Sequence, residues 1–561
     1  MTTRAGLERL PGRSDFLNKT MREGDTLNST RTIPGGVCAA LAIVFAFGQV
    51  EAGETNNRSA CESLTAMTTQ NFRVDKAGWV EASKLSPGPP GITVEVPEHC
   101  LFQVVLDPRS STIENMSFGV GIELRLPQQW NGRLLFQGGG GLNGVLNPAL
   151  GQVSGAASAL SRGFAVVSTD GGHRGRNSID SRFAIDQQAK LDFGYQAVQR
   201  ATHEAKALIE RYYGRNQDYS YFMGCSTGGR EAMMVAQRLP LEFDGVVAGN
   251  PSWNLTRVAM NQIWSLQTVT RIAPPDEKGR PVLSKAFTDE QLQAVAAAVV
   301  DECDALDGLA DGMINDFKAC RFDPVELQCG AGKSATGVCL AAEQVAALKD
   351  IVGGARNSRG ESLYGSTPYD TGIAQPAWRG MHLGNGDNPP ANASLGRDTL
   401  RLFALTPPRP DLDPLAFDFD RDTAATFETA QVNDPTASLH TTFAEHGGKL
   451  IVYHGLSDQA MWAGPLLDWY EKLLPRDGVG PQDWGRLFLV PGMTHCGGGQ
   501  STDQFDILTA IQSWVEEGKA PDRIIASGRA FPDVTRPLCP FPLVARYVGG
   551  DPNDEKSFSC H

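Results

Sequence analysis

The 561-residue sequence has no apolar run long enough to span a bilayer and no long block of like charge. A spanning helix needs about 20 consecutive apolar residues, and the apolar run at residues 37–47 falls well short of that length. The formal net charge is −14, and an acidic surface repels a phosphate backbone, so nucleic acid is not an expected partner. The chain is 41% hydrophobic and 20% charged, which indicates a globular protein.

The apolar run at 37–47 follows Arg31 and precedes a small-x-small triplet at residues 50–52. This is the order of an export signal and its cleavage site, so residues 1–52 are predicted to be a signal peptide with its pre-region. The segment before the apolar run is long, and Met21 competes with Met1 as the start. A buried N-terminal helix is the alternative. Export predicts a secreted or periplasmic protein without membrane contact after cleavage; the sequence predicts no oligomeric state.

Cysteine usage agrees with export. Of eleven cysteines, Cys38 lies in the signal, and the remaining ten form an even number. Oxidising compartments permit disulfides, and five pairs are conceivable: Cys303 with Cys320, Cys329 with Cys339, Cys539 with Cys560, Cys61 with Cys100, and the remaining Cys225 with Cys496. The spacing alone does not fix this connectivity.

Short apolar runs that end in glycine-rich or polar loops predict buried parallel strands. Such runs lie at residues 134–136, 164–168, 219–223, 245–248, 450–453 and 487–490. Helical patterns separate them, so we predict an α/β sheet with a site at the carboxyl ends of its strands. Residues 252–445 are rich in Ala, Asp, Pro and Gly and show no comparable strand series. We therefore predict a catalytic domain over 53–251 and 446–561 with an inserted lid domain over 252–445.

The pentapeptide Gly224-Cys225-Ser226-Thr227-Gly228 matches the Gly-x-Ser-x-Gly pattern of a nucleophilic serine on a strained strand-to-helix turn. Glycines two residues before and after the serine relieve crowding in such a turn. Many glycine-rich turns match this pattern, and a plain strand-to-helix turn is the alternative. The strand pattern before the serine and the helix-forming segment 229–238 after it favour Ser226 as a nucleophile.

A hydrolase of this type carries an acid and then a histidine downstream of the serine. Asp458 follows the predicted strand 450–453, and His495 follows the predicted strand 487–490. His495 would take the hydroxyl proton of Ser226, and Asp458 would hold the imidazole in the required tautomer.

Three other polar residues follow predicted strands. Asp170 and His173 precede the serine, which is the wrong order for this fold, so we interpret them as structural or pocket-lining residues. His454 is expected to hydrogen-bond a loop.

Two backbone N–H groups are candidates for an oxyanion hole. Thr227 begins the helix after the serine, where the helix dipole favours negative charge. Gly141 ends the glycine run 138–141, where the missing side chain lets the backbone approach a substrate oxygen.

Cys225 directly precedes Ser226, and Cys496 directly follows His495. A bridge between them would hold the two catalytic side chains within reach of each other. It would close a loop of about 270 residues, worth roughly 5 kcal/mol in the chain-entropy model. Two free buried cysteines are the alternative.

Asp304, Asp307 and Asp311 place three carboxylates within eight residues, and Gly308 and Gly312 allow a tight wrap. Hard oxygen ligands at this density suit Ca²⁺, with backbone carbonyls completing the shell. The spacing is not that of an EF-hand, and a solvated acidic turn is the alternative. A calcium ion here would be structural, because the nucleophile needs no metal.

Five segments together resemble the tannase and feruloyl esterase family: 168–173 (STDGGH), 224–234 (GCSTGGREAMM), 303–312 (CDALDGLADG), 487–496 (LFLVPGMTHC) and 535–540 (TRPLCP). They extend over nearly all of the chain after residue 52, and the Cys-Ser and His-Cys pairs are their most specific feature. The resemblance implies an α/β-hydrolase fold with a large lid and a triad of Ser226, Asp458 and His495 linked by a Cys225–Cys496 bridge. It also implies lid calcium held by Asp304, Asp307, Asp311 and the carbonyls of Leu309 and Met313.

The family cleaves esters of aromatic acids such as gallate and ferulate, and it includes bacterial hydrolases of the terephthalate monoester released from polyester. In that branch a lid arginine after a Trp-Arg motif binds the free carboxylate of the substrate. Trp378-Arg379 resembles the motif, but the place of the arginine falls near Ala391, and Arg397 and Arg401 are not aligned with it. The Trp-rich stretch after the motif is replaced by Gly-Met-His at 380–382.

We therefore expect a secreted serine esterase that hydrolyses phenolic esters, such as those of ferulate or gallate, through an acyl-enzyme. A hydrolase of mono(hydroxyethyl) terephthalate or a similar aromatic monoester is the alternative. A silent binding protein on the same scaffold is a third possibility, against which the complete set of serine, aspartate and histidine argues.

Overall fold

The computed structural model describes residues 51–86, 93–330, 337–386, 388–437, 440–473 and 481–561. Residues 1–50 of the predicted signal peptide, including its apolar run and Cys38, lie outside the described residues. The predicted cleavage site reaches the first residues of helix α1 (Glu51–Ser63). No helix in the described part of the chain is long and apolar enough to cross a membrane.

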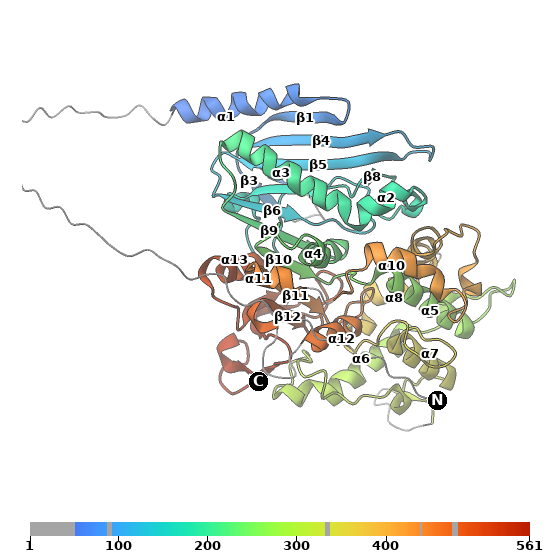
Figure 1. Ribbon diagram of the computed structural model, residues 1–561. Coiled ribbons are helices and arrows are strands. Elements are labelled where there is room, and N and C mark those ends of the chain that lie inside the picture. Colours follow the sequence, from blue (N-terminus) through green and yellow to red (C-terminus); the bar gives the residue numbers. More distant parts are fainter. Residues whose placement is uncertain (1–50, 87–92, 331–336, 387, 438–439, 474–480) are drawn as a thin grey trace, which may run out of the picture. The chain divides into compact units, whose positions relative to one another are not determined.

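A mixed ten-stranded sheet forms the centre of the unit that spans residues 51–561 (Figure 1). Its order is β1 (Phe72–Val80), β4 (His99–Arg109), β5 (Ser117–Pro127), β7 (Ala165–Thr169), β6 (Arg133–Gln137), β9 (Tyr219–Cys225), β10 (Gly245–Gly249), β11 (Lys449–Gly455) and β12 (Gly485–Val490), with β8 (His173–Arg174) beside β5. From β7 to β12 all neighbours are parallel. These six strands are the predicted ones, and the predicted α/β class is confirmed.

The parallel strands are buried on both faces, which explains why they read as continuous apolar runs. In β9, Tyr221 packs in an apolar cluster with α13 (Ile507–Glu517), whereas Phe222 packs in a second cluster with α3 (Ala197–Tyr213) and α4 (Thr227–Arg238). This alternation follows from the two-residue period of a strand. The carboxyl ends of the strands are thereby fixed between two helical layers.

The antiparallel strands β1, β4 and β5 lie outside the predicted set. Their interior carries a polar network, because Arg125 donates from Nε to Glu123 (2.7 Å) and lies 3.0 Å from the His99 ring nitrogen. Gln103 donates to the second oxygen of Glu123 (2.7 Å). All four residues lie within β4 and β5, where they interrupt the continuous apolar runs by which the parallel strands were predicted.

Between β10 and β11 the described residues form helices and isolated bridges but no β-strand. The helices are α5 (Leu255–Ile272), α6 (Asp289–Cys303), α7 (Ala342–Gly353), α8 (Pro376–His382), α9 (Leu395–Asp398), α10 (Phe427–Asn433) and α11 (Thr441–Glu445). Many residues of this segment share one apolar cluster, distinct from the two that cover the sheet. In Figure 1, α5 to α8 lie on the side of the molecule where β10 to β12 are, below β1 and β4 in this view.

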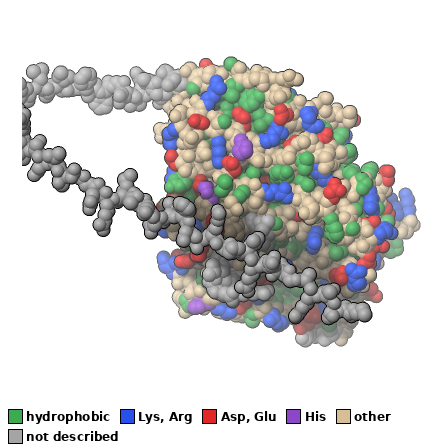
Figure 2. All heavy atoms as spheres, in the orientation of Figure 1, with side chains coloured by type: hydrophobic (Ala, Val, Ile, Leu, Met, Phe, Trp, Pro, Cys, Tyr) green, Lys and Arg blue, Asp and Glu red, His purple; other side chains and the backbone are tan. Residues whose placement is uncertain are grey.

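Charge on the surface is mixed. On the face shown in Figure 2, Lys and Arg side chains are scattered among Asp and Glu side chains and form no single basic field.

Candidate active site

Ser226 lies in the turn between β9 and α4, with a φ of 63°. A non-glycine residue rarely adopts this left-handed conformation, and such strain is typical of residues held for function. A Cβ added to Gly224 would lie 2.6 Å from the carbonyl carbon of Gly228, so the turn requires glycine at that position. The predicted order of strand, turn and helix is present, and α4 begins at Thr227.

The three predicted catalytic side chains form one hydrogen-bonded chain. The His495 Nε2 and the Ser226 Oγ are 2.8 Å apart, and the His495 Nδ1 and an Asp458 carboxylate oxygen are also 2.8 Å apart. Chemistry fixes the direction, because an ionised carboxylate only accepts. Nδ1–H therefore donates to Asp458, and Nε2 is left to accept the hydroxyl proton of Ser226.

The environment of the pair matches this assignment. Burial works to raise the pKa of the Asp458 carboxyl, but the charge and hydrogen bond of His495 hold that pKa below its ordinary value. Burial works to lower the pKa of His495, but the charge and hydrogen bond of Asp458 outweigh it and raise that pKa above its usual range. The aspartate is thus ionised at neutral pH, and its charge would stabilise an imidazolium at His495.

Backbone and side-chain amides hold the Asp458 carboxylate in place. One oxygen accepts from the N–H groups of Ala460 (2.8 Å) and Met461 (2.9 Å), and the other accepts from the Asn250 amide (2.7 Å). Asn250 follows β10 and has a φ of 34°. Asn250 was not among the predicted site residues, although its position directly after a predicted parallel strand was an available signal.

The two predicted oxyanion residues lie side by side. The Thr227 hydroxyl donates to the carbonyl of Gly141. Within the described residues, neither the Gly141 nor the Thr227 backbone N–H has a hydrogen-bond partner. Both groups are therefore available to a developing oxyanion.

All five conceivable disulfides are present. The pairs are Cys61–Cys100, Cys225–Cys496, Cys303–Cys320, Cys329–Cys339 and Cys539–Cys560. Cys225 and Cys496 have Cα atoms 6.0 Å apart and join the Ser226 turn to the loop that carries His495.

Comparison with known proteins agrees with this geometry. A family model described as tannase and feruloyl esterase matches residues 104–561. The chain is 38% identical to the mono(2-hydroxyethyl) terephthalate hydrolase of Piscinibacter sakaiensis, over 90% of this chain and 92% of that protein. It is 29% identical to a probable feruloyl esterase of Arthroderma benhamiae, over 85% and 87% of the two chains. The crystal structure of feruloyl esterase B from Aspergillus oryzae superposes with a TM-score of 0.75 at 26% identity, over 90% of this chain and all of that chain.

The chain belongs to the tannase and feruloyl esterase family. As a member of this family it is a carboxylic ester hydrolase with an α/β-hydrolase fold, and the silent binding protein is set aside.

The remaining predicted residues of this family member have structural partners. Asp170 is buried and accepts from the N–H groups of Gly121 (2.9 Å) and Gly172 (3.0 Å). The His173 ring stacks on Phe183 with centroids 3.8 Å apart. The His454 Nε2 donates to the carbonyl of Met461 (2.7 Å), which confirms the predicted bond to a loop.

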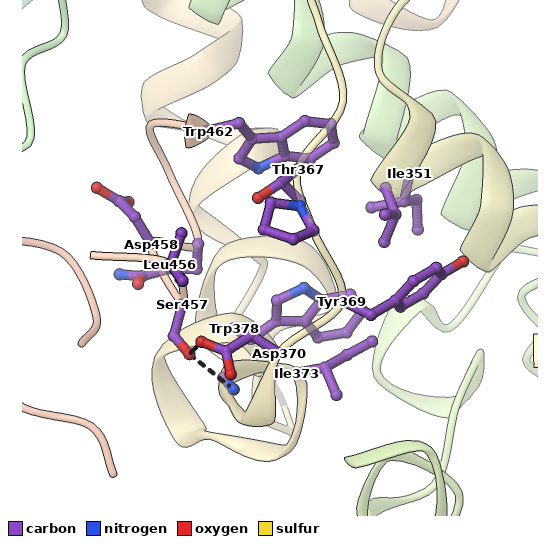
Figure 3. Close-up of a pocket in the computed structure, with 14 residues that line it drawn as sticks. Ile351, Thr367, Tyr369, Asp370, Ile373, Trp378, Leu456, Ser457, Asp458 and Trp462 are labelled. Carbon is purple, nitrogen blue, oxygen red and sulfur yellow. Dashed lines mark hydrogen bonds between the residues drawn. The ribbon is translucent and has the colours of Figure 1, made fainter. Parts of the chain in front are cut away.

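A buried carboxylate that the sequence analysis missed, Asp370, joins the helical segment to the triad loops (Figure 3). One of its oxygens accepts from the Ser457 hydroxyl (2.7 Å) and from the Gly492 N–H (2.9 Å). Ser457 directly precedes Asp458, and Gly492 lies three residues before His495. Trp378 and Trp462 line the same pocket. No motif marks Asp370, because its partners lie 87 and 122 residues away.

The acidic loop folds as its glycines predict, with φ of 99° at Gly308 and 84° at Gly312. Asp304 and Asp307 are buried, and one Asp304 oxygen has no hydrogen-bond partner. Burial raises the pKa of Asp307 to about 6, and it also raises that of Asp304. In the described part of the chain, no three His, Cys, Asp or Glu side chains converge as a metal site. Two buried carboxylates with an unsatisfied oxygen nevertheless fit a cation completed by carbonyls.

The arginines near the Trp-Arg motif are engaged with acidic neighbours. Arg379 in α8 pairs with Asp289 (2.5 Å) and donates to two carbonyls. Arg397 pairs with Asp398 (2.7 Å), and Arg401 lies 4.0 Å from the same carboxylate. Ala391 itself begins a short 3-10 turn and carries no charge.

Proposed function

We propose that this protein is an exported serine esterase that hydrolyses esters of phenolic acids, such as ferulate or gallate. The hydrogen-bonded chain from Ser226 through His495 to Asp458 carries the proposal, because it supplies a nucleophile, a base and an orienting acid in one line. The chain's similarity to feruloyl esterases supports the phenolic class of substrate.

The reaction proceeds in two steps. His495 takes the proton of Ser226 as the oxygen attacks the ester carbonyl, and the N–H groups of Gly141 and Thr227 stabilise the oxyanion. His495 then gives the proton to the departing alcohol and leaves the acyl group on Ser226. Water attacks the acyl-enzyme by the same route, with His495 again as base, and releases the aromatic acid.

The nucleophile is tested with methyl ferulate, p-nitrophenyl esters and a fluorophosphonate probe. We expect the Ser226→Ala variant to lose hydrolysis and labelling, while its melting temperature stays near that of the wild type. Retained hydrolysis in the folded variant would show that Ser226 is not the nucleophile.

A terephthalate monoester is the second candidate substrate, favoured by the 38% identity to the Piscinibacter sakaiensis hydrolase. Against it stands the uncharged Ala391 at the place where a carboxylate-binding arginine is expected. Hydrolysis rates for methyl gallate, methyl ferulate and mono(2-hydroxyethyl) terephthalate decide between them. We expect the phenolic esters to react fastest, and a faster terephthalate monoester would reverse the assignment.

Residues 252–445 are proposed to be the lid that selects the ester, since the described part of this segment has no strand and supplies most of an apolar cluster that also takes in Phe118 and Phe183. We also propose one structural calcium ion in its acidic loop. Asp304, Asp307 and Asp311 with the carbonyls of Leu309 and Met313 would hold the ion, which would supply positive charge to the buried carboxylates and take no part in the reaction.

A further inference from the structure

The first three N–H groups of the glycine loop 138–141 each donate a hydrogen bond to a different partner. The Gly138 N–H donates to the Met223 carbonyl (2.9 Å), the Gly139 N–H to a carboxylate oxygen of Glu231 (2.9 Å), and the Gly140 N–H to the Asn143 side-chain oxygen (3.1 Å). Only the fourth N–H of the run, that of Gly141, is left without a partner within the described residues. The loop therefore leaves one N–H free, that of Gly141, whose carbonyl contacts the Thr227 hydroxyl directly after Ser226.

Glu231 and Asn143 form a relay beneath this loop. Glu231 lies in α4, five residues after Ser226, and is 2% exposed. Its first oxygen accepts from the Asn143 amide nitrogen (2.8 Å), and its second accepts from Gly139. Asn143 is 3% exposed and accepts from Gly140. Arg230 is the neighbouring cation, 3.8 Å from Glu231, but it donates to the carbonyls of other segments.

Close backbone packing restricts the conformation of the loop. The Gly228 N–H donates to the Gly139 carbonyl (3.0 Å), and a Cβ on Gly228 would lie 2.8 Å from that oxygen. A Cβ on Gly139 would lie 1.9 Å from the Asn143 side-chain oxygen. Helix α4 thus contacts the loop through the backbone of Gly228 and holds it through the side chain of Glu231.

We propose that Glu231 and Asn143 are positioning residues that fix the glycine loop so that the Gly141 N–H meets the oxyanion formed at Ser226. This inference rests on the proposed function and deepens it. Neither side chain touches the substrate; each acts through the backbone of the loop. Preorganised oxyanion donors are among the largest contributions to catalysis, and loss of one lowers kcat by about 10²- to 10³-fold.

The fixed order of donors and acceptors in this relay makes the proposal testable. Glu231 must accept at both oxygens, which an ionised carboxylate does and an amide does not. In Glu231→Gln, a donor amide would face either Gly139 or the Asn143 amide, which are both donors. Adding Asn143→Asp reverses the relay: the carboxylate introduced at position 143 would accept from both Gly140 and the new glutamine amide, and the glutamine oxygen would accept from Gly139.

The experiment measures kcat and KM of Glu231→Gln, Asn143→Asp and the double variant on methyl ferulate, and the affinity of each for an aryl boronic acid. We expect Glu231→Gln to lower kcat by about tenfold to hundredfold with KM within about threefold, since part of one oxyanion contact is lost. Asn143→Asp should lose more, because two carboxylates then face each other. The double variant should recover most of the lost kcat and of the boronic acid affinity.

Glu516→Gln is the matched control, because Glu516 is also a largely buried carboxylate, paired with Arg133 and Tyr221 at the other end of the strands. It should lower the melting temperature and leave kcat within about twofold.

A wild-type kcat in folded Glu231→Gln, or a double variant no better than the worse single one, would overturn the relay. If a single variant does not fold, recovery in the double variant supports the relay, and its absence overturns it. Hydrolysis equal in wild type and Ser226→Ala would instead refute the proposed function.

Discussion

Asp458 in the triad and Asp307 in the acidic loop are both buried carboxyls, yet burial has opposite outcomes for them. Asp458 faces His495 and three amide donors, and its pKa lies below the ordinary value. Asp307 accepts from Asn315 and the Leu309 N–H but faces Asp311 instead of a cation, and burial raises its pKa to about 6. Arg536 pairs with Asp311 (2.5 Å), not with Asp304 or Asp307.

The two sites differ in whether their buried charges have partners within the protein. In the triad every charge has a partner within the chain, so the protein alone can hold the geometry. In the acidic loop two carboxylates are buried with less charge compensation than they need, which is the condition for binding a cation. A disulfide lies at each group, Cys225–Cys496 at the triad and Cys303–Cys320 at the loop.

The largest effect is expected from breaking the charge pair of the triad. Asp458→Asn should lower kcat by about 10⁴-fold, because the amide favours the wrong imidazole tautomer and cannot stabilise imidazolium. In the wild type, activity should fall with acid below a midpoint above about 6.5, since Asp458 raises the pKa of His495. In the variant the residual activity should have a lower midpoint. Both are read from kcat/KM against pH.

Asp170→Asn provides the comparison, since Asp170 is equally buried at a strand end and does not touch His495. It should destabilise the protein while kcat changes far less. A loss below about tenfold in Asp458→Asn would contradict the role given to Asp458.

The sequence was informative where the chemistry is local. Ser226, Asp458 and His495 follow buried parallel strands whose apolar runs are easy to see, and the cysteines flank two of them. Glu231, Asn143 and Asp370 carry no such signal, because their meaning arises from partners dozens of residues away. The antiparallel strands were missed for a different reason: in β5, polar residues such as Glu123 and Arg125 alternate with apolar ones, so this strand lacks the continuous apolar run by which the parallel strands were predicted.

A smaller effect on kcat is expected from removing the Cys225–Cys496 disulfide, and little effect from removing Cys303–Cys320. Cys225→Ser with Cys496→Ser opens a loop of 271 residues and Cys303→Ser with Cys320→Ser one of 17, worth about 5 and about 3 kcal/mol in the chain-entropy model. Only the first pair adjoins the reacting groups, so it should lower kcat by about tenfold to hundredfold through misplacement of Ser226 and His495. The second should lower the melting temperature with little change in kcat. Equal kcat losses in the two double variants would contradict the specific effect on catalysis assigned to the Cys225–Cys496 bridge.

The smallest effect concerns the acidic loop and its proposed calcium. Because the folded state holds a proton on Asp307 more tightly than the unfolded state, stability of the metal-free protein should fall as pH rises from about 4 to about 6. Calcium should displace that proton, remove the slope and raise the melting temperature by a few degrees at pH 7. Calorimetry with EDTA or with excess calcium measures both. Asp307→Asn should flatten the slope and weaken the calcium response. Asp323→Asn changes an exposed carboxylate paired with Lys349 and should alter neither between pH 4 and 6, because the lowered pKa of Asp323 places its own pH dependence at more acidic pH. A melting temperature that is the same with EDTA and with calcium would mean that the loop stays buried without a cation.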